Sequence, residues 1–402
     1  MAFPTMREYL RGLRSTGGLR EPGVISTAVL ALTAIAFFRV ALLPEFGAEL
    51  SMSTLQLGLV TTAFAVGRLV ADLPGGHLAD RMMARSLMAL AAGGVAVGSL
   101  LLGLSVAALT VYIGAFLLGV SSATTNATGM TFFSRVAGPG HRGTSMAVFS
   151  GALLGGQAVG PAVAGVLSSA GGWRFAMFVA TVAAGATAMI LLANRTGPIT
   201  PPPEGPARPA TQDGKQTRGS TWFIVLQTVS FAVFLTLGAV PQTLVPLIGA
   251  GDLGLSTAVI GLALGMGGFA RFLGTIVGGW LSDRVSRKVA LVPGLLGQAA
   301  GVALLALEPN LFTWLSAIVI MSLASFAVPV AATIVGDITD PERVGAHLGR
   351  FRFAGDIGLV TGPLVVSALF DGPGRVAAFG FVVIVLTIAA LLSWRLLPDG
   401  RG

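Results

Sequence analysis

The sequence is poor in the residues that metal binding, redox chemistry and covalent catalysis require. Its 402 residues include no cysteine, and only 10% of them are charged. The absence of cysteine excludes disulfides, zinc–thiolate sites and thiol catalysis. The three histidines, His77, His141 and His347, are too far apart in the sequence to indicate a metal cluster. We therefore expect no bound metal and no cofactor, and no nucleophile–base pair indicates an enzyme.

An ATP-binding loop is also missing. The single Gly-Lys pair, Gly214–Lys215, has Pro209 where a phosphate-binding loop requires its first glycine. The net charge of +8 comes from residues scattered between apolar runs, rather than from a basic face with interleaved aromatics. That distribution argues against a nucleic-acid partner. Any work that the protein does needs an energy source other than ATP.

Hydrophobic residues make up 54% of the chain, and the mean hydropathy is +0.84. A run of about 20 apolar residues crosses the hydrocarbon layer of a bilayer as a helix. Twelve such runs predict an all-α membrane protein whose partner is the lipid bilayer. The expected spans are 24–44, 55–76, 86–107, 108–133, 144–169, 173–193, 221–249, 256–280, 289–307, 311–336, 351–370 and 374–396.

Lysine and arginine are unevenly distributed between the two sides of these spans. With the N-terminus inside, 20 of the 25 lie in inner segments and only two, Arg174 and Arg375, lie in outer loops. Positive residues are retained on the cytoplasmic side of a membrane. We therefore expect both termini in the cytoplasm, and the Ala-, Gly- and Arg-rich composition suggests a bacterial inner membrane.

The second half of the chain repeats the first. At an offset of 203 residues, segment 75–81 (GGHLADR) matches segment 278–284 (GGWLSDR). Two parallel six-helix repeats are a transporter architecture, with the substrate path at their interface. Six prolines between Pro198 and Pro209 indicate a solvated linker between the repeats. The expected units are a six-helix bundle over 1–193, a cytoplasmic linker over 194–220 and a second six-helix bundle over 221–402, in a monomer.

A charged element follows the second span and recurs after the eighth. Its members are Gly76, Asp80, Arg81 and Arg85 in the first copy, and Gly279, Asp283 and Arg284 in the second. A carboxylate on a short inner loop can brace against the free N–H groups at the start of another helix. We expect Asp80 to brace the start of the eleventh helix in the outward-open state, so that this element acts as a gate.

Over residues 24–396 the chain resembles the major facilitator superfamily. The G-x-x-x-D-R element looks like that family's loop signature, with Met83 and Ser286 where a glycine is usual. The fifth span resembles the helix associated with proton antiporters of the drug-export type, through Gly156, Gly160, Pro161 and Gly165. In the fourth span, Ala115 stands where such antiporters have an arginine. The resemblance implies two pseudo-symmetric bundles and export of a small molecule in exchange for protons.

Charged residues inside the spans are costly and are therefore candidates for function. Arg68 and Asp72 lie one turn apart in the second span, and Arg352 and Asp356 lie one turn apart in the eleventh. Each pair either neutralises itself or takes part in proton transfer. Because no histidine lies well inside a span, Asp72 and Asp356 are the candidate proton carriers, with Arg68 and Arg352 as their partners.

Arg39 in the first span has no carboxylate one turn away. It either pairs with another helix or binds an anionic group in the central cavity, and its position resembles that of an arginine in organic-anion carriers of the superfamily. Gln242 is its counterpart at the 203-residue offset. With Asn126, these two residues are the candidate substrate site near the pseudo-two-fold axis. We expect the rest of the cavity to be apolar and lined by Gly and Ala, which suits an amphiphilic ligand.

Three hypotheses follow for the function. The first is a secondary active transporter that exports a small amphiphilic organic molecule by alternating access, in antiport with protons. The second is an organic-anion carrier, for uptake or exchange, that uses Arg39. The third is a membrane receptor or scaffold that does not transport, and it predicts eroded loop motifs, whereas both copies are nearly intact.

Overall fold

The computed structural model describes residues 20–136, 142–193, 220–339 and 344–397, and these residues form helices and short connections. The first half contains α2 (Arg20–Glu49), α3 (Thr54–Arg81), α4 (Ala84–Gly103), α5 (Ala108–Val136) and α6 (Arg142–Ala193). The second half contains α7 (Ser220–Ala239), η1 (Val240–Leu244), α8 (Val245–Gly251), α9 (Thr257–Arg284), α10 (Arg287–Ala306), α11 (Leu311–Leu323), η2 (Ala324–Phe326), α12 (Ala327–Ile338), α13 (Val344–Asp371) and α14 (Arg375–Leu396).

These elements correspond to the twelve expected spans, with differences in detail. The fifth and sixth spans form α6, which is interrupted at Gly172, where φ is 81°. The seventh span contains the π-helical turn η1, and the tenth is divided by the 3₁₀ turn η2. The expected linker lies outside the described residues except for Ser220, which begins α7.

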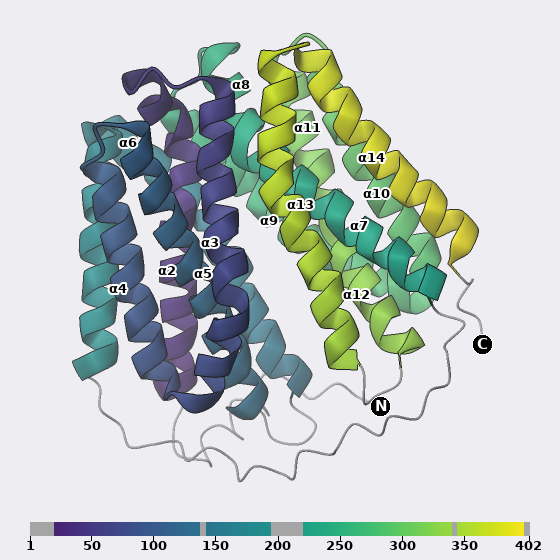
Figure 1. The fold of residues 1–402 in the computed structure, drawn as a ribbon, viewed down its shortest axis with the longest axis horizontal. Coiled ribbons are helices and arrows are strands. Elements are labelled where there is room, and N and C mark those ends of the chain that lie inside the picture. The colour runs from purple at the N-terminus through teal and green to yellow at the C-terminus, as the bar shows by residue number, and fades with distance from the viewer. Residues whose placement is uncertain (1–19, 137–141, 194–219, 340–343, 398–402) are drawn as a thin grey trace.

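The two halves form two helical bundles that lie side by side (Figure 1). Matching ion pairs occupy matching places in them. Glu49 at the end of α2 pairs with Arg174 in α6 at 2.7 Å, and Asp252 after α8 pairs with Arg375 at the start of α14. The repeat that was detected in the sequence therefore extends to tertiary contacts.

Small residues in α6 and α13 allow close helix crossings. A Cβ atom on Gly156 or Gly160 would lie 2.5 or 2.3 Å from a backbone oxygen of α2, so both crossings require glycine. Gly358 and Gly362 in α13 are equally close to backbone oxygens of α7. The segment of the fifth span that was singled out in the sequence thus packs α6 against α2.

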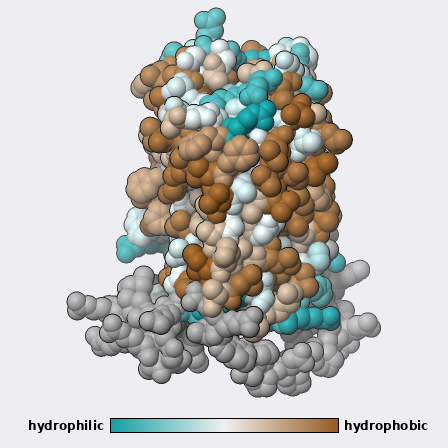
Figure 2. All heavy atoms as spheres, turned by 90° about the vertical axis from the view of Figure 1, so that its left-hand side faces the viewer, coloured by the Kyte–Doolittle hydropathy of each residue, from teal (hydrophilic) through white to brown (hydrophobic). Residues whose placement is uncertain are grey.

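The outer surface of the molecule suits lipid contact. Figure 2 shows a largely hydrophobic face between more hydrophilic ends. Large apolar side chains are exposed on both halves, among them Val182, Met189, Phe269 and Ile384. Exposed apolar area of this extent is unfavourable in water and favourable in a bilayer. The protein is therefore a multi-pass membrane protein.

The bundles meet at one end, which we name the Asp371 end. There the Asp371 carboxylate accepts a hydrogen bond from the backbone N–H of Leu55 at 2.8 Å, so α13 caps the start of α3. Further along α3, toward its middle, Thr62 Oγ1 donates to the Val360 carbonyl at 3.0 Å. On the other side of the interface, a Cβ atom on Gly165 would lie 2.4 Å from the Thr257 carbonyl oxygen.

At the opposite end, which we name the Asp80 end, the ion pairs among the described residues join helices of the same half. Asp80 pairs with Arg135 of α5 at 2.7 Å, and Arg287 of α10 pairs with Asp337 of α12 at 2.6 Å. A Cβ atom on Gly76 would meet no described atom within 4 Å. The ribbons of the two bundles diverge toward this end in Figure 1. The halves are therefore latched at the Asp371 end and separated at the Asp80 end.

Candidate functional site

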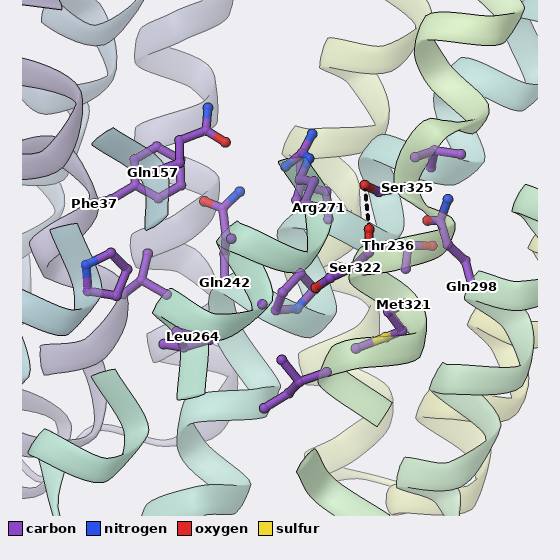
Figure 3. A pocket seen from close by; sticks show the side chains of 18 of the residues that line it. Phe37, Gln157, Thr236, Gln242, Leu264, Arg271, Gln298, Met321, Ser322 and Ser325 are labelled. Atoms are coloured by element: carbon purple, nitrogen blue, oxygen red, sulfur yellow. Dashed lines mark hydrogen bonds between the residues drawn. The ribbon is translucent and has the colours of Figure 1, made fainter. Parts of the chain in front are cut away.

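A pocket lies between the two halves, and the empty space of about 880 Å³ in and in front of it includes open solvent. The first half contributes Phe37 and Val40 from α2 and Gln157 and Pro161 from α6, and most of the remaining lining comes from α7, η1, α9 and α11 (Figure 3). Its apolar lining consists mainly of large side chains such as Phe234, Leu264, Ile318 and Met321. The expectation of a Gly/Ala lining was wrong, because glycine serves helix crossings here and contributes only Gly267 and Gly268 to the pocket.

Arg39 and Gln242 lie against each other, as expected from their matching places in the repeat. Arg39 Nη2 donates to Gln242 Oε1 at 2.6 Å, Nη1 is 3.4 Å from Thr61 Oγ1, and the guanidinium carbon lies 3.9 Å from the centre of the Phe64 ring. Arg39 is 0% exposed and its Nε atom has no hydrogen-bond partner. Gln242 lines the pocket, so Arg39 is separated from the pocket by its own partner.

The contact between Arg39 and Gln242 also joins the two halves, because one residue belongs to α2 and the other to η1. A second hydrogen bond, from Thr243 Oγ1 to Thr61 Oγ1 at 3.0 Å, joins η1 to α3 beside it. Asn126 on α5 is buried, and its side chain makes no hydrogen bond to Arg39 or Gln242. The structure thus brings together two of the three residues of the candidate substrate site.

Four charged residues gather where α3 and α13 meet. The carboxyl groups of Asp72 and Asp356 lie within hydrogen-bonding reach of each other across the two halves, although Asp72 Oδ2 has no hydrogen-bond partner, and Arg68 and Arg352 are close enough to interact with Asp356. Within the described residues, no ion pair joins either arginine to the aspartate one turn away. Arg68 Nη1 instead lies 3.3 Å from Ser122 Oγ. The two aspartates therefore belong to one cluster with both arginines, in which Arg68 interacts with Asp72 as well as with Asp356.

The two copies of the charged loop element differ in their contacts. Asp80 is held by Arg135, whereas Asp283 makes no hydrogen bond or ion pair to any residue that the structure describes. Arg284 lies over the Trp280 ring at 5.3 Å, and Arg85 pairs with Glu21 at 3.0 Å. With the Asp80 end separated, the expected brace between Asp80 and α13 is not formed, and its formation in another state stays a prediction.

Sequence reasoning missed Arg271 as a site residue. This arginine lies on α9 and lines the pocket, and its guanidinium makes no hydrogen bond or ion pair within the described part of the chain. The sequence held a signal for it, because Arg271 is the counterpart of Arg68 at the 203-residue offset and has no carboxylate within one turn. The offset alone does not reveal which of the arginines in the spans faces the pocket.

Comparison with known proteins shows to which family the chain belongs. The family model described as Major Facilitator Superfamily matches residues 24–249 and 228–402, which together cover nearly the whole chain. The chain belongs to the major facilitator superfamily. It has the fold of membrane transporters and is not an enzyme, as the sequence predicted.

Individual members of the superfamily are similar at low identity. The chain is 25% identical over 386 residues to a probable galactarate/D-glucarate transporter of Bacillus subtilis, covering 87% of this chain and 85% of that protein. It is 27% identical over 405 residues to a chloramphenicol resistance protein of Streptomyces lividans, covering 91% and 97%. The crystal structure of a bacterial homologue of the human lysosomal transporter Spinster, inward-facing and occupied, superimposes with a TM-score of 0.76 at 16% identity, covering 95% and 96%.

Removal of the Asp371 cap should shift the transporter away from the conformation described here. Loss of a helix cap costs about 1 kcal/mol, equivalent to about a fivefold change in population. We expect Asp371→Ala to increase the fraction of molecules with the Asp80 end closed by about fivefold. Spin labels at Met83→Cys and Val285→Cys, both exposed positions, report that closure as a shorter distance, and the absence of native cysteine prevents background labelling.

The matched control is Asp252→Ala, which breaks an ion pair at the same end but inside one half. This variant should leave the distance distribution unchanged. An equal shift in both variants would mean that Asp371 does not act as a latch between the halves.

Proposed function

We propose that the protein is a proton-coupled antiporter that exports a small amphiphilic organic molecule by alternating access. The observation that carries the proposal is the contact between the Asp72 and Asp356 carboxyl groups across the two halves. Two carboxyl groups in contact are most stable when they share a proton, because two negative charges at that distance repel each other. A movement that separates α3 from α13 changes how readily the pair holds its proton.

The location of the pair suits such a coupling. On α3, the next glycines toward the Asp80 end, Gly75 and Gly76, have no neighbours from the other half within 4 Å of a Cβ atom. The carboxyl pair therefore lies where the two halves begin to diverge, and a rocking movement of the bundles changes its surroundings first. Substrate binding and proton binding then compete through the same movement.

The predicted topology supports the direction of transport. It places the Asp80 end in the cytoplasm, so the separated end gives the pocket a route to the cytoplasm. The large apolar side chains of the pocket favour an amphiphilic substrate. The similarity to a chloramphenicol resistance protein agrees with export, whereas the similarity to a galactarate/D-glucarate transporter favours the second candidate, a carrier of organic anions.

Reconstituted protein tests the proposal. We expect proteoliposomes to accumulate chloramphenicol or naphthaleneacetate when a pH difference is imposed with the lumen acidic, and to show no accumulation above protein-free liposomes without it. A difference of one pH unit supplies ~1.4 kcal/mol per proton, or about tenfold accumulation for one exchanged proton. Equal accumulation with and without the pH difference would exclude proton coupling. Proteoliposomes in which a proton ionophore has abolished the pH difference serve as the control.

A further inference from the structure

We infer that Arg271 is the anchor for the substrate and that it selects amphiphilic molecules carrying a single carboxylate. The inference deepens the proposed function and rests on it, because it assigns a substrate class to the same pocket. Its basis is a cation that faces the pocket without a partner among the described residues, together with two glutamine amides that line the same pocket.

The charge of the pocket is uncompensated. Arg271 is the only charged residue among those that line it, and no aspartate or glutamate is present on its wall. A guanidinium at membrane depth is unfavourable unless a partner or water satisfies its donors. A cation kept in this place without a protein partner is a ready site for an anion, and the planar guanidinium fork matches a carboxylate with two parallel hydrogen bonds.

Two glutamines add donors to the same pocket. Gln242 accepts the hydrogen bond from Arg39 through its Oε1 atom, so the NH₂ group of the same amide is left as a donor. Gln157 on α6 lines the first-half side of the pocket, and its side chain makes no hydrogen bond within the described residues. Figure 3 shows both glutamines and Arg271 around the pocket, whereas Gln298 is already used, because its Nε2 atom donates to the Ala324 carbonyl at 3.2 Å.

The apolar lining determines the rest of the substrate class. Phe37, Phe234, Leu264 and Met321 line the pocket with apolar side chains, which pack well against an apolar body and offer no hydrogen bonds to a small hydrophilic anion. One positive charge balances one negative charge, so a dianion such as D-glucarate would leave a charge unpaired in a largely apolar cavity. An aromatic or aliphatic body with one carboxylate satisfies both the charge and the lining.

Binding to purified protein in a neutral maltoside detergent tests the inference without requiring transport. The probes are naphthaleneacetate and dodecanoate, each compared with the primary amide of the same skeleton, so that only the charge differs. For wild type we expect at least one carboxylate to bind on the order of tenfold more tightly than its amide. The two skeletons distinguish an aromatic ligand from a lipid-derived one.

Variants of Arg271 test whether this residue causes the preference for the carboxylate over the amide. Arg271→Gln should reduce the carboxylate-to-amide preference to about one while leaving the affinity for the amide unchanged, and Arg271→Lys should retain part of the preference. Unchanged amide affinity shows that the variant is folded. Arg395→Gln, which removes one charge from an exposed position at the end of α14, should keep the full preference.

Two results would overturn the inference. One is that neither carboxylate binds wild type more tightly than its amide, including the case in which neither member of the pair binds. The other is that Arg271→Gln retains the preference. Either result is compatible with the proposed function if a pH difference drives transport. If a pH difference does not drive transport but the carboxylate preference is observed, proton coupling is excluded and the role of Arg271 in binding is retained.

Discussion

Asp356→Asn should uncouple transport from the pH difference. The variant retains the shape of the side chain but cannot exchange a proton. Accumulation driven by one pH unit should therefore fall from about tenfold to no net accumulation. Exchange of labelled for unlabelled substrate without a gradient should persist, because it needs no net proton movement. Asp72→Asn should behave in the same way, since its carboxyl group contacts that of Asp356 from the other half.

The alternative is that the four charges only stabilise the contact between α3 and α13. Loss of one carboxylate would then leave two arginines with one aspartate in a cluster of which only Asp356 is buried and Arg352 is exposed, so the cost in stability should stay below the ~3–5 kcal/mol of a fully buried pair. A lower melting temperature with normal gradient-driven accumulation would support that alternative and contradict a coupling role. Asp283→Asn is the control, because Asp283 is exposed and has no ion-pair partner within the described residues.

Arg39→Met should stabilise the purified protein and slow its turnover. Arg39 is fully buried among Gln242, Thr61 and Phe64, which are all uncharged, and its Nε atom has no acceptor. Replacement of a buried charge by an apolar side chain of similar volume is often stabilising, by about 1–4 kcal/mol. Because Arg39 contacts Gln242 of the other half, opening of the Asp371 end would separate the two side chains, and an apolar side chain there should hold that end closed and slow transport at least about fivefold.

Gln242→Met should have the opposite effect on stability. It leaves the guanidinium buried without its closest acceptor, which should cost about 1.5–3 kcal/mol and lower the melting temperature. The measurements are the melting temperature of the protein without substrate and the rate of exchange in liposomes. A lower melting temperature for Arg39→Met would contradict this account, and an unchanged one with a lost ligand-induced shift would favour direct substrate binding by Arg39.

The sequence left open whether Arg39 pairs with another helix or binds an anionic group. The structure places Asp72 and Asp356 in their own cluster, and Arg39 is bonded to η1 and α3 instead. Neutralising Arg39 therefore leaves no carboxylate stranded. For this reason we expect neutralisation of Arg39 to increase the stability of the protein. We assign substrate binding instead to Arg271, the arginine of the second half that faces the pocket.

The sequence by itself determined the twelve spans, the repeat and the residues that deserved attention, because apolar runs of sufficient length have no stable place other than the bilayer. The matching offset also placed Arg39 and Gln242 in one candidate polar site near the pseudo-two-fold axis, and the structure shows that the two side chains are in contact. Tertiary structure alone decided which face of each helix meets the pocket and that Asp72 contacts Asp356, 284 positions further along the chain. The physical reason is that lipid and protein interior are equally apolar, so the hydrophobic pattern of a membrane helix does not reveal which face packs inward, and close packing of small residues such as Gly160 sets its rotation.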